Sequence, residues 1–453
     1  MKNKVSPKIM SGFMELLPAE QIVFDQMKQI IEQTYQTYGF VSLDTPVMEL
    51  SEVLLAKAGG ETEKQIYRFQ KGDADISLRF DLTVPLARYV AAHQNDLAFP
   101  FRRCQISKSY RGERPQRGRL REFYQADIDI IGSEKLSVLS DAELPSIIYQ
   151  TLRNLGLEHF IIRLNNRKVL KGFYEALGLA NKQVDILRLI DKIDKIGVQN
   201  VMEGLTDLGL DKTECDAIQS LIDIKGTSTE VIDALRGLGI QNDMFTQGVD
   251  ELEKVAEAMI NLGTPESHFK IDLTIARGLD YYTGTVYETN VIGHEEWGSI
   301  CSGGRYENLA ENYTDRKYPG VGMSIGLSRL FDFLRGAGML KIGTTTPADV
   351  LIVPMTNDTR YALKVATMLR GAGVKTEVYF ADTKFKNKMA YANKIKVPYV
   401  LILGEDEEKS TSVSLKNMAT GDQQSIILGN LIPVMEEAVL ARSPEKPVRQ
   451  GKL

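Results

Sequence analysis

The sequence has few of the residues that build metal sites and disulfide frameworks. Three cysteines and four histidines occur among its 453 residues. The cysteines (Cys104, Cys215 and Cys301) lie far apart and form no CxxC pair, which argues against disulfides and against a zinc ribbon. The histidines show no HExxH spacing, so each is interpreted as a surface or structural residue. We therefore expect no metal site built from protein ligands.

Long apolar runs are also missing. No segment approaches the roughly 20 apolar residues of a membrane-spanning helix, and residues 1–4 lead into no signal-like apolar core. We therefore expect a cytoplasmic protein that does not contact membranes. The formal net charge of −5 argues against a protein that coats nucleic acid with its whole surface. Any contact with RNA must come from local basic surfaces.

The length of the chain predicts two or three domains, because 453 residues are too many for one compact core. We expect a first domain over residues 1–335, with an almost wholly helical insertion at about 168–262. A linker at 336–347 follows. Residues 348–442 have a βαβαβ pattern, which predicts a small α/β domain of the parallel type, and residues 443–453 are expected to be a disordered tail.

Residues 101–132 carry the densest set of polar chemistry, as a strand, a charged loop and a second strand. On the second strand, alternation puts six polar or aromatic residues on one face: Arg119, Arg121, Phe123, Gln125, Asp127 and Asp129. Burying that row without a partner would be costly, so the face should meet solvent or a ligand. The charge along this row changes from cationic at the arginines to anionic at the aspartates. It suits a ligand that is anionic at one end and cationic or donor-rich at the other. An ordinary edge strand or a basic patch for nucleic acid fits the same residues.

Residues 79–89, RFDLTVPLARY, contain a second candidate site. Asp81 and Thr83 come just before a proline that can open a helix. Either side chain can simply cap that helix. A carboxylate beside a hydroxyl also suits an ammonium group, which has three donors. Both interpretations stay open on the residues alone.

Four segments resemble the motifs of one enzyme family. Residues 110–125, YRGERPQRGRLREFYQ, are similar to motif 2 of class II aminoacyl-tRNA synthetases in the form used by histidyl-tRNA synthetases. Residues 277–284, RGLDYYTG, closely match the histidine-specific signature of the same enzymes. The expected long helix over residues 22–38, Gly39 and the proline-containing segment 40–49 together resemble motif 1, and the glycine-rich segment 320–330 resembles motif 3. The chain departs from the family at Glu307, where Asp is usual, and at Ser328, where Glu is common.

The resemblance covers nearly the whole chain and implies both a fold and an activity. The implied fold is α+β, a class II antiparallel sheet flanked by helices, with a helical insertion and a C-terminal α/β anticodon-binding domain. The implied activity is ATP-dependent ligation of L-histidine to tRNA(His) through a histidyl-adenylate, with Mg²⁺ on the β- and γ-phosphates. The resemblance also implies a homodimer built on motif 1 and an insertion that contacts the tRNA acceptor arm.

The resemblance gives the site residues their expected roles. Phosphate charge would be neutralised by Arg111, Arg277 and Arg329. The ATP-binding set is Arg111, Glu113, Arg119, Arg121 and Arg329. The histidine-binding set is Asp81, Thr83, Arg111, Gln125, Asp129, Arg277, Tyr281 and Tyr282. Gln116, in the loop of motif 2, would touch the acceptor end of the tRNA.

Three other functions are weighed against this one. A non-catalytic paralogue that regulates the phosphoribosyl transferase of histidine synthesis usually lacks the anticodon domain and the motif arginines, and this chain keeps both. A class II synthetase for another amino acid is disfavoured by residues 277–284. A pure RNA-binding module is disfavoured by the acidic net charge.

Overall fold

The structure is a computed structural model that describes the chain except for residues 1–3, 57–59, 276–281, 309, 441–445 and 450–453. The chain divides into two compact units. The first consists of Met1–Met14, Lys28–Met339 and Gln450–Leu453, and the second of Glu15–Met27 and Leu340–Arg449. Within the described residues, no helix is long and apolar enough to cross a membrane.

The first unit is built on a mainly antiparallel sheet. Its strands, in spatial order, are β1 (Val41–Ser42), β5 (Phe101–Tyr110), β6 (Glu122–Ile131), β11 (Gly320–Ile325), β10 (Cys301–Tyr306), β9 (Tyr282–Val291), β7 (Phe160–Asn166) and β8 (Phe269–Ile271). Within the described part of this sheet, only the outer pairs, β1 with β5 and β7 with β8, are parallel. This architecture confirms the predicted fold class, a class II type of sheet with helices around it.

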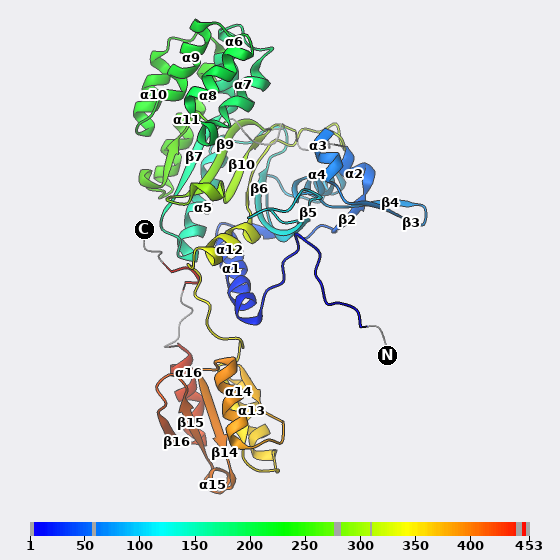
Figure 1. Cartoon of the computed structure of the whole chain (residues 1–453), viewed down its shortest axis with the longest axis vertical. Coiled ribbons are helices and arrows are strands. Elements are labelled where there is room, and N and C mark those ends of the chain that lie inside the picture. The colour runs from blue at the N-terminus through cyan, green and yellow to red at the C-terminus, as the bar shows by residue number, and fades with distance from the viewer. Residues whose placement is uncertain (1–3, 57–59, 276–281, 309, 441–445, 450–453) are drawn as a thin grey trace. The chain divides into compact units, whose positions relative to one another are not determined.

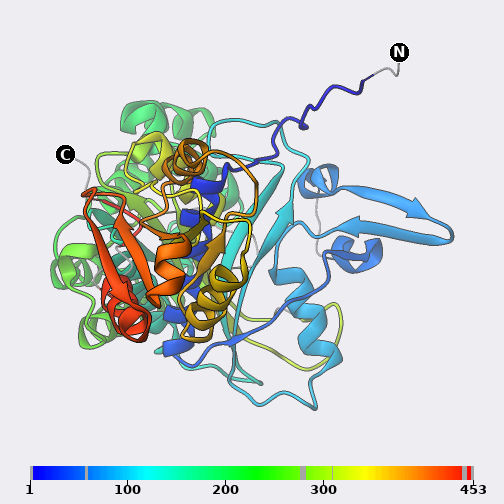
Figure 2. The ribbon, with the colours of Figure 1, turned by 90° about the horizontal axis from the view of Figure 1, so that it is seen from below.

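Helices and a small second sheet surround the main sheet. The small sheet has the order β2 (Met48–Leu50), β4 (Ala74–Leu78), β3 (Arg68–Lys71). The β3–β4 hairpin projects from the body of the unit in both ribbon views (Figure 1, Figure 2). The helices outside the insertion are α1 (Pro18–Thr37), α2 (Ser51–Leu55), α3 (Gly60–Gln65), α4 (Thr83–Ala92), α5 (Ser140–Leu155) and α12 (Leu327–Gly336), with the short 3-10 turns Glu266–His268 and Glu295–Trp297.

The helical insertion follows β7 directly and gathers at one end of the unit (Figure 1). Its helices are α6 (Arg167–Ala176), α7 (Gln183–Ile190), α8 (Ile193–Asp207), α9 (Lys212–Asp223), α10 (Ser228–Gly237) and α11 (Asp243–Asn261). Local sequence explains where several of them begin. Capping boxes start α9 at Asp211 and α10 at Thr227, and the Asn166 side chain accepts from Lys168 N to start α6. A shared apolar core that includes Phe173 and Leu252 holds these helices together.

Strand β6 shows how the pattern of the sequence becomes a site. Its apolar residues Ala126, Ile128 and Ile130 are at most 1 % exposed and pack into the core. The alternate side chains Gln125, Asp127 and Asp129 must therefore lie on the other face, as the alternation predicts. The predicted row is confirmed from Phe123 to Asp129. It is wrong for Arg119 and Arg121, which precede the strand, because β6 begins at Glu122.

A buried ion pair fixes α5 against the middle of the sheet. Asp141 is fully buried, and its carboxylate accepts from Arg305 Nε at 3.0 and 2.9 Å and from Thr285 Oγ1 at 2.7 Å. Because both carboxylate oxygens have donors, this buried charge is compensated. The pair holds the end of β10 in place, and Tyr306, the next residue, contributes to the site described below.

The second unit contains a smaller mixed sheet in the order β13 (Thr376–Val378), β12 (Val350–Pro354), β14 (Tyr399–Leu403), β15 (Ser412–Asn417), β16 (Gln423–Ile427). The pairs of β12 with β13 and β14 are parallel, as the βαβαβ pattern predicts, whereas β15 and β16 form an antiparallel hairpin that the sequence analysis did not identify. The helices are α13 (Arg360–Gly371), α14 (Phe385–Ile395), α15 (Glu405–Lys409) and α16 (Leu431–Leu440), with a 3-10 turn at Leu428–Asn430.

The prediction of a disordered tail is wrong at two positions. Val448 is 3 % exposed and forms an isolated β-bridge with Leu340. Lys341 N donates to Pro447 O at 2.9 Å. Pro447 and Val448 therefore pair with Leu340 and Lys341. The composition of the tail alone cannot predict this contact.

Candidate active site

Strands β6, β11, β10 and β9 and the start of α4 surround a cavity of about 190 Å³, here called the amino-acid cavity. Six of its lining residues were predicted as site residues: Asp81, Thr83, Arg111, Gln125, Asp129 and Tyr282. Asp127 was predicted only as a member of the polar face of the strand, without a role, and five lining residues were not predicted: Ser302, Tyr306, Gly322, Met323 and Ser324. Segments that are up to about 240 residues apart in the sequence therefore contribute to one cavity.

Asp81 and Thr83 lie at the entrance to α4. Asp81 Oδ1 accepts from the backbone nitrogens of Thr83 at 3.1 Å and Val84 at 2.9 Å. These bonds satisfy donors that the first turn of a helix leaves open. Asp81 thus caps the helix and also lines the cavity, so the two interpretations of this residue are compatible.

Arg111 is held between two aromatic rings at the end of β5. Its guanidinium carbon lies 4.5 Å from the centre of the Phe80 ring and 5.0 Å from the centre of the Phe123 ring. Its Nε donates to Phe80 O at 3.3 Å. Aromatic faces attract a cation and fix its plane, so the guanidinium is presented to the amino-acid cavity in a defined orientation.

Asp129 lines the amino-acid cavity and has donors on both of its oxygens. Arg103 Nη2 is 2.8 Å from Asp129 Oδ2, and the Tyr306 hydroxyl donates to Oδ1 at 3.1 Å. Burial raises the pKa of Asp129, and the charge of Arg103 opposes that rise. Burial also raises the pKa of Tyr306, so its hydroxyl keeps the proton that it donates. Arg103 and Tyr306 were not predicted, because their link to Asp129 depends on strand pairing and not on any local motif.

The motif 2 loop and the first turn of α12 form a separate cluster of charge. Arg119 Nη1 is 3.5 Å from Glu113 Oε2, and Arg121 Nε donates to Glu113 O at 3.1 Å. Gln116 and Arg119 pair across the tip of the loop. Gly118, at φ +70°, lies against Arg329, where a Cβ would be 3.5 Å from Arg329 Cγ.

Arg329 is mostly buried, and one of its hydrogen-bond donors has no partner within the described residues. Its Nη2 donates to Trp297 O, whereas its Nε has no hydrogen-bond partner in the described part of the chain. Burial lowers the pKa of Arg329, and the nearby charge of Arg119 lowers it further. Two neighbouring cations with an unused donor are suited to an anion that carries several oxygens.

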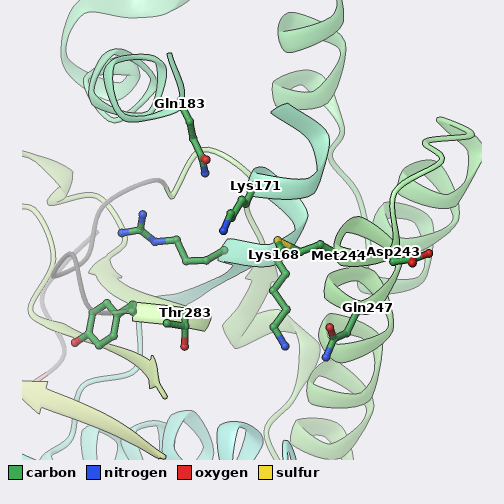
Figure 3. Close-up of a pocket in the computed structure, with 9 residues that line it drawn as sticks. Lys168, Lys171, Gln183, Asp243, Met244, Gln247 and Thr283 are labelled. Carbon is green, nitrogen blue, oxygen red and sulfur yellow. The ribbon is translucent and has the colours of Figure 1, made fainter. Parts of the chain in front are cut away.

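A larger cavity of about 490 Å³, here called the insertion cavity, lies between the insertion and β9. Its lining residues are Arg167, Lys168, Lys171, Gln183, Asp243, Met244, Gln247, Tyr282 and Thr283. Figure 3 shows Lys171 from α6 and Gln183 from α7 turned into the same space, with Thr283 of β9 beyond them. Lys168 Nζ is paired with Glu251 Oε1 at 2.6 Å. Tyr282 lines this cavity and the amino-acid cavity, so the two adjoin.

Two predicted residues, Arg277 and Tyr281, lie outside the described residues. Ser328, where the family commonly has Glu, is 1 % exposed, and its Oγ accepts from Tyr124 N at 2.9 Å. The hydroxyl thereby joins the start of α12 to β6. Within the described residues, no group of three or more His, Cys, Asp or Glu side chains is arranged to hold a metal ion.

Comparisons with known proteins agree along the chain. The family model described as histidyl-tRNA synthetase matches residues 12–330, and the anticodon binding domain model matches residues 349–438. The chain is 56% identical to a histidine–tRNA ligase of Clostridium tetani over 438 residues, which is 96% of this chain and 100% of that protein. It is 47% identical to one from Finegoldia magna, over 94% of this chain and 99% of that protein.

Solved structures give the same result. The histidyl-tRNA synthetase of Nostoc sp. PCC 7120 matches with a TM-score of 0.89 and 40% identity, over 96% of this chain and 100% of that chain. A Bacillus halodurans structure described as an ATP phosphoribosyltransferase regulatory subunit/histidyl-tRNA synthetase matches with a TM-score of 0.74 and 20% identity, over 89% of this chain and 99% of that chain. At 20% identity, the match to the Bacillus halodurans structure supports the fold alone.

Proposed function

The chain belongs to the histidyl-tRNA synthetase family, and from this premise we propose how its residues ligate histidine to tRNA(His). The observation that carries the proposal is the amino-acid cavity, where Asp81, Arg111, Asp129 and Tyr282 meet from separate segments. Its polar lining offers acceptors for an ammonium group, a fixed cation for a carboxylate, and paired hydrogen-bonding groups for an imidazole.

The reaction has two steps. A carboxylate oxygen of histidine attacks the α-phosphorus of ATP, a new O–P bond forms, and the bond to the β-phosphate breaks to release pyrophosphate. A ribose hydroxyl at the end of the tRNA then attacks the carbonyl carbon of the histidyl-adenylate, and AMP leaves. Because both reactants of the first step are anions, catalysis consists of alignment and charge stabilisation, and no protein nucleophile is needed.

The arginines supply the charge for the first step. Arg111, fixed between Phe80 and Phe123, would bridge the histidine carboxylate and the α-phosphate. Arg329, with its unused Nε, would hold the bent β- and γ-phosphates. Arg277 is assigned to the α-phosphate by the family resemblance alone.

The motif 2 loop would bind the rest of the nucleotide. Glu113 would accept from the exocyclic amine of adenine, while Arg119 and Arg121 would add positive charge on the phosphate side. Gln116 would contact the acceptor end of the tRNA. The electrostatic interaction of Arg119 and Glu113 with Arg329 supports one continuous nucleotide site across loop and helix.

Mg²⁺ is expected to arrive with ATP, held mainly by phosphate oxygens. Glu288 acts electrostatically on Arg329, and its carboxylate would offer the ion one further oxygen. When bound, the ion would neutralise phosphate charge beside Arg329.

Histidine would lie across the floor of β6. Asp81, Thr83 and Gln125 would receive the α-ammonium group. Asp129 and Tyr282 would bond the two imidazole nitrogens, with Tyr281 assigned beside them by the resemblance. A site that pairs every polar group of its substrate rejects analogues that leave those groups unpaired by roughly 10⁴-fold or more.

The experiment that tests this function is pyrophosphate exchange with each amino acid in turn. The expected result is exchange that depends on histidine and on no other amino acid. Exchange with a different amino acid would move the chain to another class II specificity. No exchange with any amino acid would assign it to the non-catalytic regulatory paralogues.

The insertion cavity is proposed to receive the end of the tRNA. It adjoins the amino-acid cavity through Tyr282 and carries Arg167, Lys168 and Lys171 on its wall. Lysine and arginine side chains are the usual partners of phosphates in nucleic-acid contacts. A terminal nucleotide bound there would have its ribose hydroxyl near the activated carboxyl group.

Replacing Lys171 with glutamine is expected to lower tRNA charging by about tenfold, the worth of one charge-assisted hydrogen bond, and to leave pyrophosphate exchange unchanged. Lys171 is half exposed, and its pairing with Glu175 at 3.9 Å is weak, so the fold should tolerate the change. Lys212→Gln on α9 is the matched control, because Lys212 is exposed and does not line the cavity. Equal charging by both variants would refute the assignment.

The remaining proposals concern assembly. We propose a homodimer through the motif 1 region, where Val41 of β1 and Met48 and Leu50 of β2 are 51–56% exposed, because exposed apolar side chains in one region favour a protein partner. The division into a catalytic domain at 1–335 with an insertion at about 168–262, a linker, an anticodon-binding domain at 348–442 and a tail is likewise proposed, as is a cytoplasmic location.

A further inference from the structure

Asp127 lines the amino-acid cavity, yet the family resemblance gives it no role. It lies on β6 between Gln125 and Asp129, with its side chain on the same face. The residue is 3 % exposed, and its Oδ1 has no hydrogen-bond partner among the residues that the structure describes. Leaving a buried carboxylate oxygen without a donor is costly. A ligand that brings a donor would remove that cost.

The charges around Asp127 indicate what kind of donor fits. Arg103, the register partner of Asp129 on β5, is a buried cation on the same face of the sheet, and its Nη2 lies 2.8 Å from Asp129 Oδ2. Arg103 therefore acts on two neighbouring carboxylates, Asp81 adds a third negative group, and Arg79 is a second cation whose donors are bonded to backbone carbonyls. A cationic donor would both bond the open oxygen of Asp127 and be attracted by the three carboxylates, whereas a neutral donor would only form the hydrogen bond.

Titratable or charged groups on each neighbouring element interact electrostatically with Asp127. They are Asp81 and Arg79 before α4, Arg103 on β5, Asp129 on β6, Cys301 on β10 and Tyr35 on α1. Burial, more than any of these groups, raises the pKa of Asp127 to about 7. A bound cation would favour the ionised carboxylate.

Ser324 on β11 connects Asp127 to Gln125. Gln125 Nε2 donates to Ser324 Oγ at 3.0 Å, and the Ser324 hydroxyl hydrogen-bonds the Asp127 carboxylate. This arrangement uses the amide nitrogen of Gln125 and leaves its Oε1 without a partner within the described chain. Two unpaired oxygen acceptors, one from each side chain, therefore line the same cavity.

We propose that Asp127, beside the Gln125 amide already assigned there, accepts a hydrogen bond from the α-ammonium group of histidine, and that Ser324 is the positioning residue for both side chains. The inference rests on the proposed function and extends its ammonium site beyond Asp81, Thr83 and Gln125. Near pH 7 the ammonium is a cation with three donors, whereas the imidazole is mostly neutral. Arg103 already balances Asp129 at the imidazole end, so the charge of Asp127 is available for the ammonium.

The test compares two ligands on two proteins by calorimetry. The ligands are L-histidine and 3-(imidazol-4-yl)propionate, which is histidine without its ammonium group. Asp127→Asn should bind histidine about tenfold or more weakly than the wild type, because it loses a charged acceptor. Its affinity for the propionate should change by less than about twofold, since that ligand has no ammonium to lose. Asp185→Asn, on the exposed face of α7, controls for the loss of one negative charge.

The outcomes separate the inference from the function on which it rests. An equal loss for both ligands, or no loss for histidine, would overturn the role of Asp127 alone. A wild-type protein that binds no histidine would overturn the proposed function and this inference with it. If Asp127→Asn does not fold, Ser324→Ala is the deciding variant. It should lower the affinity for histidine several-fold and leave the affinity for the propionate unchanged. An equal loss of affinity for both ligands would overturn the proposal.

The pH dependence gives a readout that a structural role would not move. Protonation of Asp127 below its pKa of about 7 removes the charge that attracts the ammonium. The ratio of wild-type to Asp127→Asn affinity for histidine should therefore fall as the pH drops through about 7 and level off above it. The ratio cancels the titration of histidine itself. A ratio that stays constant from about pH 6 to pH 8 would contradict the proposal.

Discussion

Replacing Arg111 with alanine is expected to lower histidine-dependent pyrophosphate exchange by about 10³-fold, the scale on which loss of a preorganised charge affects a phosphoryl-type transition state. Histidine affinity should fall much less. The guanidinium lies between the rings of Phe80 and Phe123 and lines the amino-acid cavity. A cation held in this way does not have to move when the carboxylate and the phosphate approach each other. It therefore stabilises the transition state, where negative charge develops, more than the ground state.

The lysine variant at this position separates charge from geometry. Arg111→Lys keeps the charge but loses the planar fork that can bind two oxygens at once, so its exchange rate should lie between those of the alanine variant and the wild type. Arg316→Ala removes an exposed arginine that lines neither cavity, and serves as the matched control. Full activity in Arg111→Lys would mean that a point charge is enough. Equal losses in rate and in affinity would make Arg111 a ground-state binding residue.

The sequence predicts the floor of the site because strand alternation is a local property. Gln125 and Asp129 share a face of β6 for the same reason that Ile128 is buried on the other face. The helix cap at Asp81 is also local. What brings these segments into one cavity is not local, and it could be expected only from the resemblance to a family.

Strand pairing accounts for what the sequence analysis missed. Arg103 becomes the partner of Asp129 because β5 and β6 pair in one register, and Ser324 lies beside Asp127 because β11 pairs with β6 in another. Neither register follows from the alternation of a single strand. The role of Ser328 is similar, since its acceptor bond to Tyr124 N crosses about 200 residues of sequence.

Pairing also explains why Gly322 is required to be glycine, and this gives the second large effect. Gly322 is the register partner of Asp129. A Cβ built at Gly322 would overlap Asp129 Oδ1 and lie 2.9 Å from Asp129 Cγ. Asp129 cannot easily move away, because Arg103 holds its other oxygen at 2.8 Å. Gly322→Ala must therefore displace the carboxylate at the imidazole end of the cavity.

Gly322→Ala is expected to reduce histidine-dependent exchange by about 10²-fold, since a displacement near 1 Å in a positioned group has effects of that size. ATP affinity should be retained, because the motif 2 loop and Arg329 lie in a separate cluster. Gly326→Ala is the matched control at the end of the same strand: its Cβ would meet Arg329 Cβ at 3.6 Å and Ile300 O at 3.8 Å, which are ordinary contacts. Steady-state exchange and ATP binding should be measured on both variants. A Gly322→Ala protein that matches Gly326→Ala in exchange would mean that Asp129 need not hold the position seen here, and its assignment to the imidazole would fail.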